Sequence, residues 1–77
     1  NPFNPVTKIS FSIPNNSHTK LTVYDISGKQ VAELINSELD AGSYNIDFDA
    51  SQFASGTYFY RITAGNFTEV KKMILVK

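Results

Sequence analysis

The sequence predicts an all-β fold, a sandwich of two antiparallel sheets packed face to face within one domain, residues 1–77. Three observations predict it. Apolar and polar residues alternate with a period of two in most segments, turn-forming residues recur about every 8–12 residues, and no stretch shows good helical periodicity. Two packed sheets are the economical way to bury one face of each of six or seven strands.

Each predicted strand lies between turn signals. Pro14 ends the first strand because proline has no N–H for a β-ladder, and residues 15–18 predict a polar loop. Asp25 and Gly28 delimit a type I turn in which the carboxylate accepts backbone N–H bonds and the glycine takes a positive φ. Gly65–Asn66 predicts a two-residue hairpin turn. The predicted strands span residues 7–13, 20–26, 29–35, 43–49, 57–64 and 67–77.

The remaining connections and the last strand carry further predictions. Gly42 supplies a permissive backbone before the fourth strand. In the bend over residues 49–56 we expect Phe53 and Ala54 to tuck under the sandwich as a plug. The tail at residues 73–76 is apolar on both of its faces, which predicts a strand covered on both sides.

Charge and composition exclude several classes of function. Seven basic residues balance seven acidic ones, so the chain lacks the basic stripe that nucleic-acid binding needs. It has no cysteine for a disulfide or a thiolate metal site. No apolar run approaches the roughly 20 residues of a membrane helix, and no signal peptide is recognised. Because the chain starts at Asn1 and not at Met, we expect it to be a piece of a larger precursor.

The candidates for catalysis or metal binding are few. His18 is the single histidine and sits in the predicted polar loop, where a solvated surface role is favoured. Asp47 and Asp49 share one face of a strand, as a Ca²⁺ site or an acid–base pair requires. Ca²⁺ prefers six to eight oxygens, which no dense Asp/Asn loop supplies, so a polar outer face with an Asx cap after Asp49 is favoured. We therefore predict no enzyme activity, cofactor, metal or small-molecule substrate.

Aromatic and lysine side chains allow two interpretations each. Tyr44, Tyr58 and Tyr60 fit a sandwich core better than a sugar-stacking platform, whereas Phe59 points away from Tyr58 and Tyr60 and is expected at the surface. Lysines on the terminal strand are either edge gatekeepers against aggregation or a recognition handle, and the residues do not decide between them. These lysines are Lys71, Lys72 and Lys77.

Five segments, taken together and in order, resemble the C-terminal sorting domains of type IX secretion. The blocks are NPFNP with Thr7, Ile9 and Phe11, then LTVYDISGKQV from Leu21, AGSY from Ala41, ASGTYFYRI from Ala54, and KKMILVK from Lys71. Each block alone is moderately specific, but the resemblance spans essentially the whole chain. One departure is Phe48, where members of the family often carry tryptophan; a large inward aromatic is kept.

The resemblance implies an immunoglobulin-like sandwich of about seven strands at the C-terminus of a larger exported protein. It further implies that the outer-membrane secretion machinery of a Gram-negative bacterium recognises this domain and that the attached N-terminal cargo, after reaching the periplasm, passes to the cell surface or medium. In many members a sortase-like peptidase then removes the domain. The recognition and signature candidates are Asn4, Pro5, Gly28, Gly42, Gly56, Tyr58, Lys72, Leu75 and Lys77.

The residues alone also allow two other functions. A structural immunoglobulin-like spacer has a similar strand pattern, as in the flagellar hook-capping protein. A carbohydrate-binding module of a secreted enzyme needs an exposed aromatic platform, for which Phe59 and one surface tyrosine are the minimum.

Overall fold

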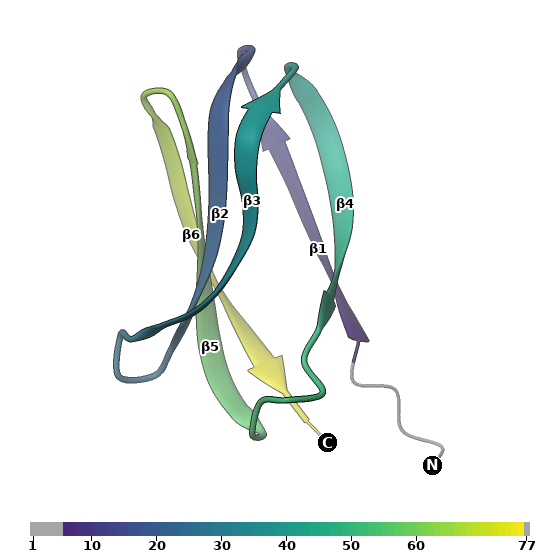
Figure 1. The fold of residues 1–77 in the computed structure, drawn as a ribbon, viewed down its shortest axis with the longest axis vertical. Helices are drawn as coiled ribbons and strands as arrows, with labels where there is room; N and C mark the ends of the chain where they lie inside the picture. Colours follow the sequence, from purple (N-terminus) through teal and green to yellow (C-terminus); the bar gives the residue numbers. More distant parts are fainter. Residues whose placement is uncertain (1–5, 77) are drawn as a thin grey trace.

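Six β-strands in two antiparallel sheets make up residues 6–76, which are the residues that the computed structural model describes (Figure 1). The small sheet pairs β1 with β4, and the large sheet has the order β3-β2-β5-β6. The strands are β1 (Val6–Ile13), β2 (Ser17–Asp25), β3 (Gln30–Leu39), β4 (Gly42–Asp49), β5 (Gly56–Ala64) and β6 (Phe67–Leu75). The all-β sandwich is confirmed, and none of the described residues forms a helix long and apolar enough to cross a membrane.

The strand count and several strand boundaries differ from expectation, chiefly the start of β2 and the end of β3. The described residues contain six strands where the family resemblance led us to expect about seven, because residues 50–55 form a turn between β4 and β5. The loop predicted over residues 15–18 is also shorter, since β2 already begins at Ser17. The cause is β3, which runs on to Leu39 and gives Ser17 and His18 ladder partners in Leu39 and Glu38.

The core lies between the two sheets and follows the predicted alternation. Every second residue of β1 faces inward and is almost fully buried: Ile9, Phe11 and Ile13. Leu21 and Val23 of β2 are 0% exposed and belong to the same core. The other buried apolar residues are Phe48, Ala50, Tyr58, Tyr60, Ile62, Ala64 and Leu75. The core thus takes side chains from both sheets, which holds the layers together.

The hairpin between β2 and β3 has the predicted turn. The Gly28 N–H donates to the Asp25 carbonyl at 2.9 Å, and Gly28 has φ 89°, which a side chain disfavours. The Asp25 carboxylate accepts hydrogen bonds from the Ser27 N–H at 2.9 Å, the Ser27 hydroxyl at 2.6 Å and the Lys29 N–H at 3.1 Å. The Ser27 hydroxyl and then the Lys29 N–H hold the pKa of Asp25 below its ordinary value, because they stabilise the ionised form.

The hairpin between β5 and β6 is also as predicted. Ala64 pairs with Phe67 across the two-residue turn Gly65–Asn66. Gly65 has φ 60° and no described non-glycine residue has a positive φ, so the turn matches type II′, with glycine at its first central position. This turn type has the right-handed twist of the flanking strands and therefore fixes the register of β6 on β5.

The plug predicted between β4 and β5 is half right. Phe53 packs against the core, with its ring centroid 5.5 Å from that of Phe48 and 6.1 Å from that of Tyr58. Ala54 is exposed, and only its carbonyl takes part, as the acceptor of the Tyr58 hydroxyl at 2.8 Å. A single aromatic ring therefore closes this end of the sandwich.

The tail of the last strand is not covered on both faces, contrary to prediction. Leu75 is buried and Met73 is partly buried against the core, but Ile74 is 63% exposed and Val76, directly after the strand, is 72% exposed. The physical reason is the two-layer architecture. No described element packs on the outer face of the large sheet, so alternate apolar residues of β6 point to solvent.

Candidate functional site

The last strand lies at a free edge of the large sheet. Among the described residues β6 has one strand neighbour, β5, and β1 likewise has one, β4. Free strand edges present unpaired backbone N–H and C=O groups, which can template pairing with another chain. The geometry therefore meets the requirement for strand addition at β6.

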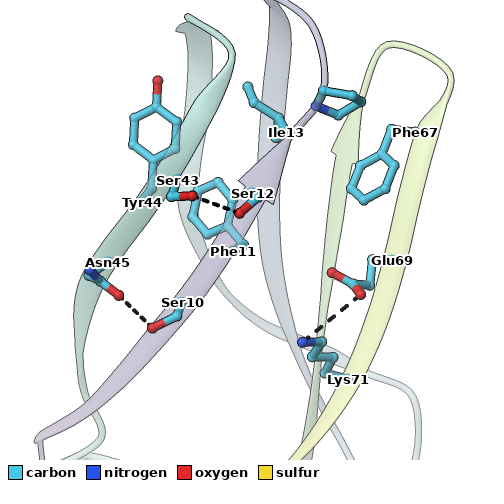
Figure 2. Close-up of a pocket in the computed structure, with 11 residues that line it drawn as sticks. Ser10, Phe11, Ser12, Ile13, Ser43, Tyr44, Asn45, Phe67, Glu69 and Lys71 are labelled. Carbon is cyan, nitrogen blue, oxygen red and sulfur yellow. Dashed lines mark hydrogen bonds and ion pairs between the residues drawn. The ribbon is translucent and has the colours of Figure 1, made fainter.

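A groove of about 620 Å³ opens between β1 and β6 (Figure 2). Its apolar lining includes Phe11 and Tyr44, whose rings stack with centroids 5.4 Å apart, and Phe67 from the start of β6. The groove exists because a two-stranded sheet faces a four-stranded one and leaves part of the inner face of β6 without a covering strand.

The polar groups that line this groove are paired with one another. Ser10 donates to Asn45 at 2.5 Å, and the Ser12 and Ser43 hydroxyls lie 2.9 Å apart (Figure 2). The inward-facing pair of Glu69 and Lys71 forms an ion pair at 3.9 Å. The acid, the amine and the serine hydroxyls that line the groove therefore each have a partner within the described residues.

The two described lysines of β6 have different surroundings. Lys71 lies opposite Tyr60, on the inward face beside the groove, and is paired with Glu69. Lys72 lies opposite Phe59, on the outer face, and its side chain makes no hydrogen bond or ion pair with another of the described residues. The choice between an edge gatekeeper and a recognition handle stays a prediction for both lysines.

The predicted surface position of Phe59 is confirmed in part. It points away from the buried Tyr58 and Tyr60 but is itself half-buried. Its ladder partner on β2 is Tyr24, so two aromatic side chains lie next to each other on the outer face. The Arg61 guanidinium lies over the Tyr24 ring, with its carbon 5.2 Å from the centroid.

Sequence reasoning missed the pairing of Tyr24 with Arg61. The Arg61 Nη2 donates to the Tyr24 hydroxyl at 2.6 Å. The alternation of inward and outward residues places both side chains on the outer face, because Tyr24 follows the inward Val23 and Arg61 follows the inward Tyr60. Their contact depends on the register of β2 against β5, which sequence alone does not supply.

The remaining signature candidates sit at turns or in the core. Gly42 and Gly56 are the first residues of β4 and β5, with φ values of 147° and 151°. Tyr58 is buried and donates to a loop carbonyl, and Leu75 is 6% exposed. Their recognition by a partner stays a prediction, as it does for Asn4, Pro5 and Lys77, which lie outside the described residues.

The titratable candidates occupy ordinary surface positions. His18 is exposed, as predicted, although it lies in β2; its Nε2 is 2.6 Å from Asn36 Oδ1 and its Nδ1 is 3.5 Å from Glu38. Asp47 pairs with Lys8 at 3.2 Å. The Asx cap after β4 is confirmed, because Asp49 accepts from the Ser51 N–H at 3.0 Å. Within residues 6–76 no three His, Asp or Glu side chains gather closely enough to hold a metal ion.

Comparison with known proteins gives one match. The model of a family described as "Secretion system C-terminal sorting domain" matches residues 1–77. No curated protein and no solved structure matches the chain.

Proposed function

We propose, from the premise that this chain belongs to the secretion system C-terminal sorting domain family, that its last strand β6 is the element the secretion machinery recognises. Domains of this family are the C-terminal sorting signals of the type IX secretion system, and sorting is the function of this chain. The family implies an interaction with the type IX machinery and attachment to an N-terminal cargo, which is exported from a Gram-negative cell.

The observation that carries the proposal is the free edge of β6. The strand pairs with β5 on one side and has no strand neighbour on the other within residues 6–76. A receptor strand added at this edge gains main-chain hydrogen bonds along its length. Lys72, which has no described partner, adds charge complementarity, which mainly affects selectivity and association rate.

We also propose the finer steps that the resemblance implies. The cargo crosses the outer membrane from the periplasm to the cell surface or medium, and a sortase-like peptidase then removes the domain. The domain itself is the C-terminal end of the precursor. Nothing in the described residues favours a structural spacer or a carbohydrate-binding module instead.

The test is to occupy the β6 edge without unfolding the domain. Deleting residues 71–77 removes the core residue Leu75, so loss of export by that variant has two explanations. A better variant extends the C-terminus with an Asn-Gly turn and about seven β-forming residues, which fold back and pair with β6. The matched control carries an extension of the same length made of glycine and serine.

Each extended domain is fused to the C-terminus of a periplasmic reporter in a host with the type IX machinery, and the exported fraction is measured. We expect export with the flexible extension and loss of export with the strand-forming one. Equal export from both fusions contradicts recognition through the β6 edge. Absence of export from the unmodified domain contradicts the sorting function itself.

A further inference from the structure

The outer face of the large sheet carries a continuous patch of apolar and cationic side chains near β6. Across the ladder, Tyr24 of β2 lies beside Phe59 of β5, which lies beside Lys72 of β6, and Arg61 lies beside Val70. The small sheet lies on the opposite side of the large one, so no described element covers this face (Figure 1). The outer-face patch consists of Tyr24, Phe59, Arg61, Val70, Lys72 and Ile74.

The exposed large apolar side chains are concentrated on β6 and directly after it. Val70 is 58% exposed and Ile74 is 63% exposed, and Val76 continues the same alternation just beyond β6. Of the described residues, the other exposed large hydrophobics are Val6 and Ile26, which lie at the start of β1 and in the β2–β3 turn. Clustered exposed apolar residues indicate an interaction surface, whereas scattered ones do not.

The charge of the patch has one sign. Arg61 and Lys72 are its charged members, and it includes no carboxylate. The acidic side chains of the same outer face belong to β3 at the far edge, where Glu33 lies 3.7 Å from Lys20 and Glu38 lies 3.5 Å from His18. The sheet is therefore apolar and positive toward β6 and charge-compensated toward β3.

We propose that the outer-face patch docks onto a protein surface with an apolar centre flanked by carboxylates, on the same partner that recognises β6. This inference rests on the proposed function and extends the recognition surface from the strand edge to the sheet face. Apolar contact with Val70 and Ile74 supplies the burial, and carboxylates opposite Lys72 and Arg61 supply electrostatic complementarity.

Other occupants fit the patch less well. A two-fold pair of identical copies places the cations Arg61 and Lys72 of one copy near those of the other, which is repulsive. A sugar-stacking platform needs well-exposed aromatic rings, whereas Phe59 is half-buried and the Arg61 guanidinium lies over the Tyr24 ring. A nucleic acid needs many phosphate contacts, which two cations on a chain with no net charge do not provide.

The first experiment compares isoleucines of similar exposure. Ile74→Ser alters the patch, and Ile26→Ser alters the β2–β3 turn, where the isoleucine is 70% exposed. Both are introduced into the reporter fusion, and the exported fraction is measured together with the thermal midpoint of the domain. We expect Ile74→Ser to lower export about fivefold or more, since centrally buried interface residues cost over 1 kcal/mol when truncated. Ile26→Ser should export normally.

A second pair of variants tests charge. Lys72→Glu reverses a patch cation, and Lys8→Glu reverses a cation on the outer face of β1, where it also breaks the ion pair with Asp47. Lys8→Glu is therefore expected to perturb the fold at least as much as Lys72→Glu does. Export reduced by Lys72→Glu and kept by Lys8→Glu supports the proposal. Equal export from both variants, or an equal loss from both, overturns it.

The chemistry of the partner is tested by carbodiimide coupling in exporting cells, which joins a lysine amine to a carboxylate in direct contact. We expect an amide between Lys72 and an aspartate or glutamate of the secretion machinery, mapped by mass spectrometry. Lys72→Arg keeps the charge but lacks the reactive amine, and should keep export while losing this link. Coupling of Lys72 only to a second copy of the domain, or export that depends on a bound glycan, overturns the proposal.

The two proposals fail separately. If the strand-forming extension leaves export intact, the β6 edge is not recognised, and the proposed function loses its mechanism. If that extension abolishes export while Ile74→Ser and Lys72→Glu export normally, recognition is confined to the edge, and the outer-face patch alone is excluded.

Discussion

The hydroxyls of Tyr44 and Tyr58 make the same hydrogen bond at two places in the sandwich. Each donates to the carbonyl oxygen four residues earlier, Tyr44 to Asp40 at 2.5 Å and Tyr58 to Ala54 at 2.8 Å. Each hydrogen bond therefore joins the start of a strand to the connection that precedes that strand. The arrangement is like the tyrosine corner of immunoglobulin-type sandwiches, whose hydroxyl bonds to backbone a few residues upstream.

The same local sequence produces both bonds. A glycine stands two residues before each tyrosine, and Gly42 and Gly56 have nearly the same φ, 147° and 151°. Two of the blocks that resemble the sorting-domain family, AGSY and ASGTY, therefore encode one structural device used twice. The glycine and the tyrosine of each block have a structural role in this fold. Their presence in both blocks does not by itself indicate contact with a partner.

Removing the two hydroxyls should have unequal effects. Tyr58 is buried and Tyr44 is only partly buried, so an acceptor left without its donor is more costly near Tyr58. We expect Tyr58→Phe to lower the free energy of unfolding by about 1 kcal/mol and Tyr44→Phe by less than about 0.5 kcal/mol. Urea unfolding at neutral pH measures both. Equal losses, or no loss for Tyr58→Phe, would contradict the structural role.

Local features of the fold were predictable from the sequence. The Asp25–Gly28 turn, the Gly65–Asn66 turn and the inward face of β1 each depend on a few neighbouring residues, and all are confirmed. The inward position of Phe53 was predictable because it is the one large apolar residue in the bend over residues 49–56.

Features that depend on which strands become neighbours were not predictable. The exposure of Ile74 follows from the absence of a third layer among the described elements, and the contact of Tyr24 with Arg61 follows from strand register. Both depend on pairings between residues far apart in the chain. The outer-face patch is therefore visible only in the folded structure, although every residue in it is ordinary in sequence.

Phe53 should contribute to stability through packing alone. Its ring contacts Phe48 and Tyr58 at one end of the sandwich, and the side chain is half-buried. We expect Phe53→Ala to lower the free energy of unfolding by about 2 kcal/mol, less than the 3–5 kcal/mol of a fully buried phenylalanine. The adjacent, exposed Gln52→Ala is the control and should change stability by less than about 0.5 kcal/mol. Thermal and urea unfolding test this, and similar losses for both variants would show that Phe53 is not a plug.

Asp25 should make the domain sensitive to acid. Its pKa is lower in the folded chain than the ordinary value of 3.8, so its contribution is complete above that value and is lost as the pH falls through the folded pKa. We expect the urea midpoint of the wild type to fall between about pH 6 and pH 3 by more than that of Asp25→Asn. Asp40→Asn, which removes a carboxylate without a described hydrogen bond, is the control for the loss of one negative charge. An unchanged dependence in Asp25→Asn would remove Asp25 as the cause.

The inward-facing pair of Glu69 and Lys71 should protect the free edge of β6 from self-association. Both side chains lie beside the groove, where an added strand would cover them, and inward-pointing charges are a known defence of edge strands. Replacing them with β-forming residues, Glu69→Val with Lys71→Thr, leaves the net charge of the chain unchanged. The ion pair is partly exposed, so its loss should cost less than about 1 kcal/mol of stability.

We therefore expect this double variant to remain folded but to form dimers or larger species as its concentration rises, measured by sedimentation velocity. The control is Lys72→Thr, which removes a charge from the same strand but from its outer face, and which should stay monomeric. The control changes the net charge of the chain, whereas the double variant does not. If only the double variant associates, the cause is therefore the change on the inward face and not a change in net charge. A double variant that stays monomeric, or a control that associates equally, would show that other features guard this edge.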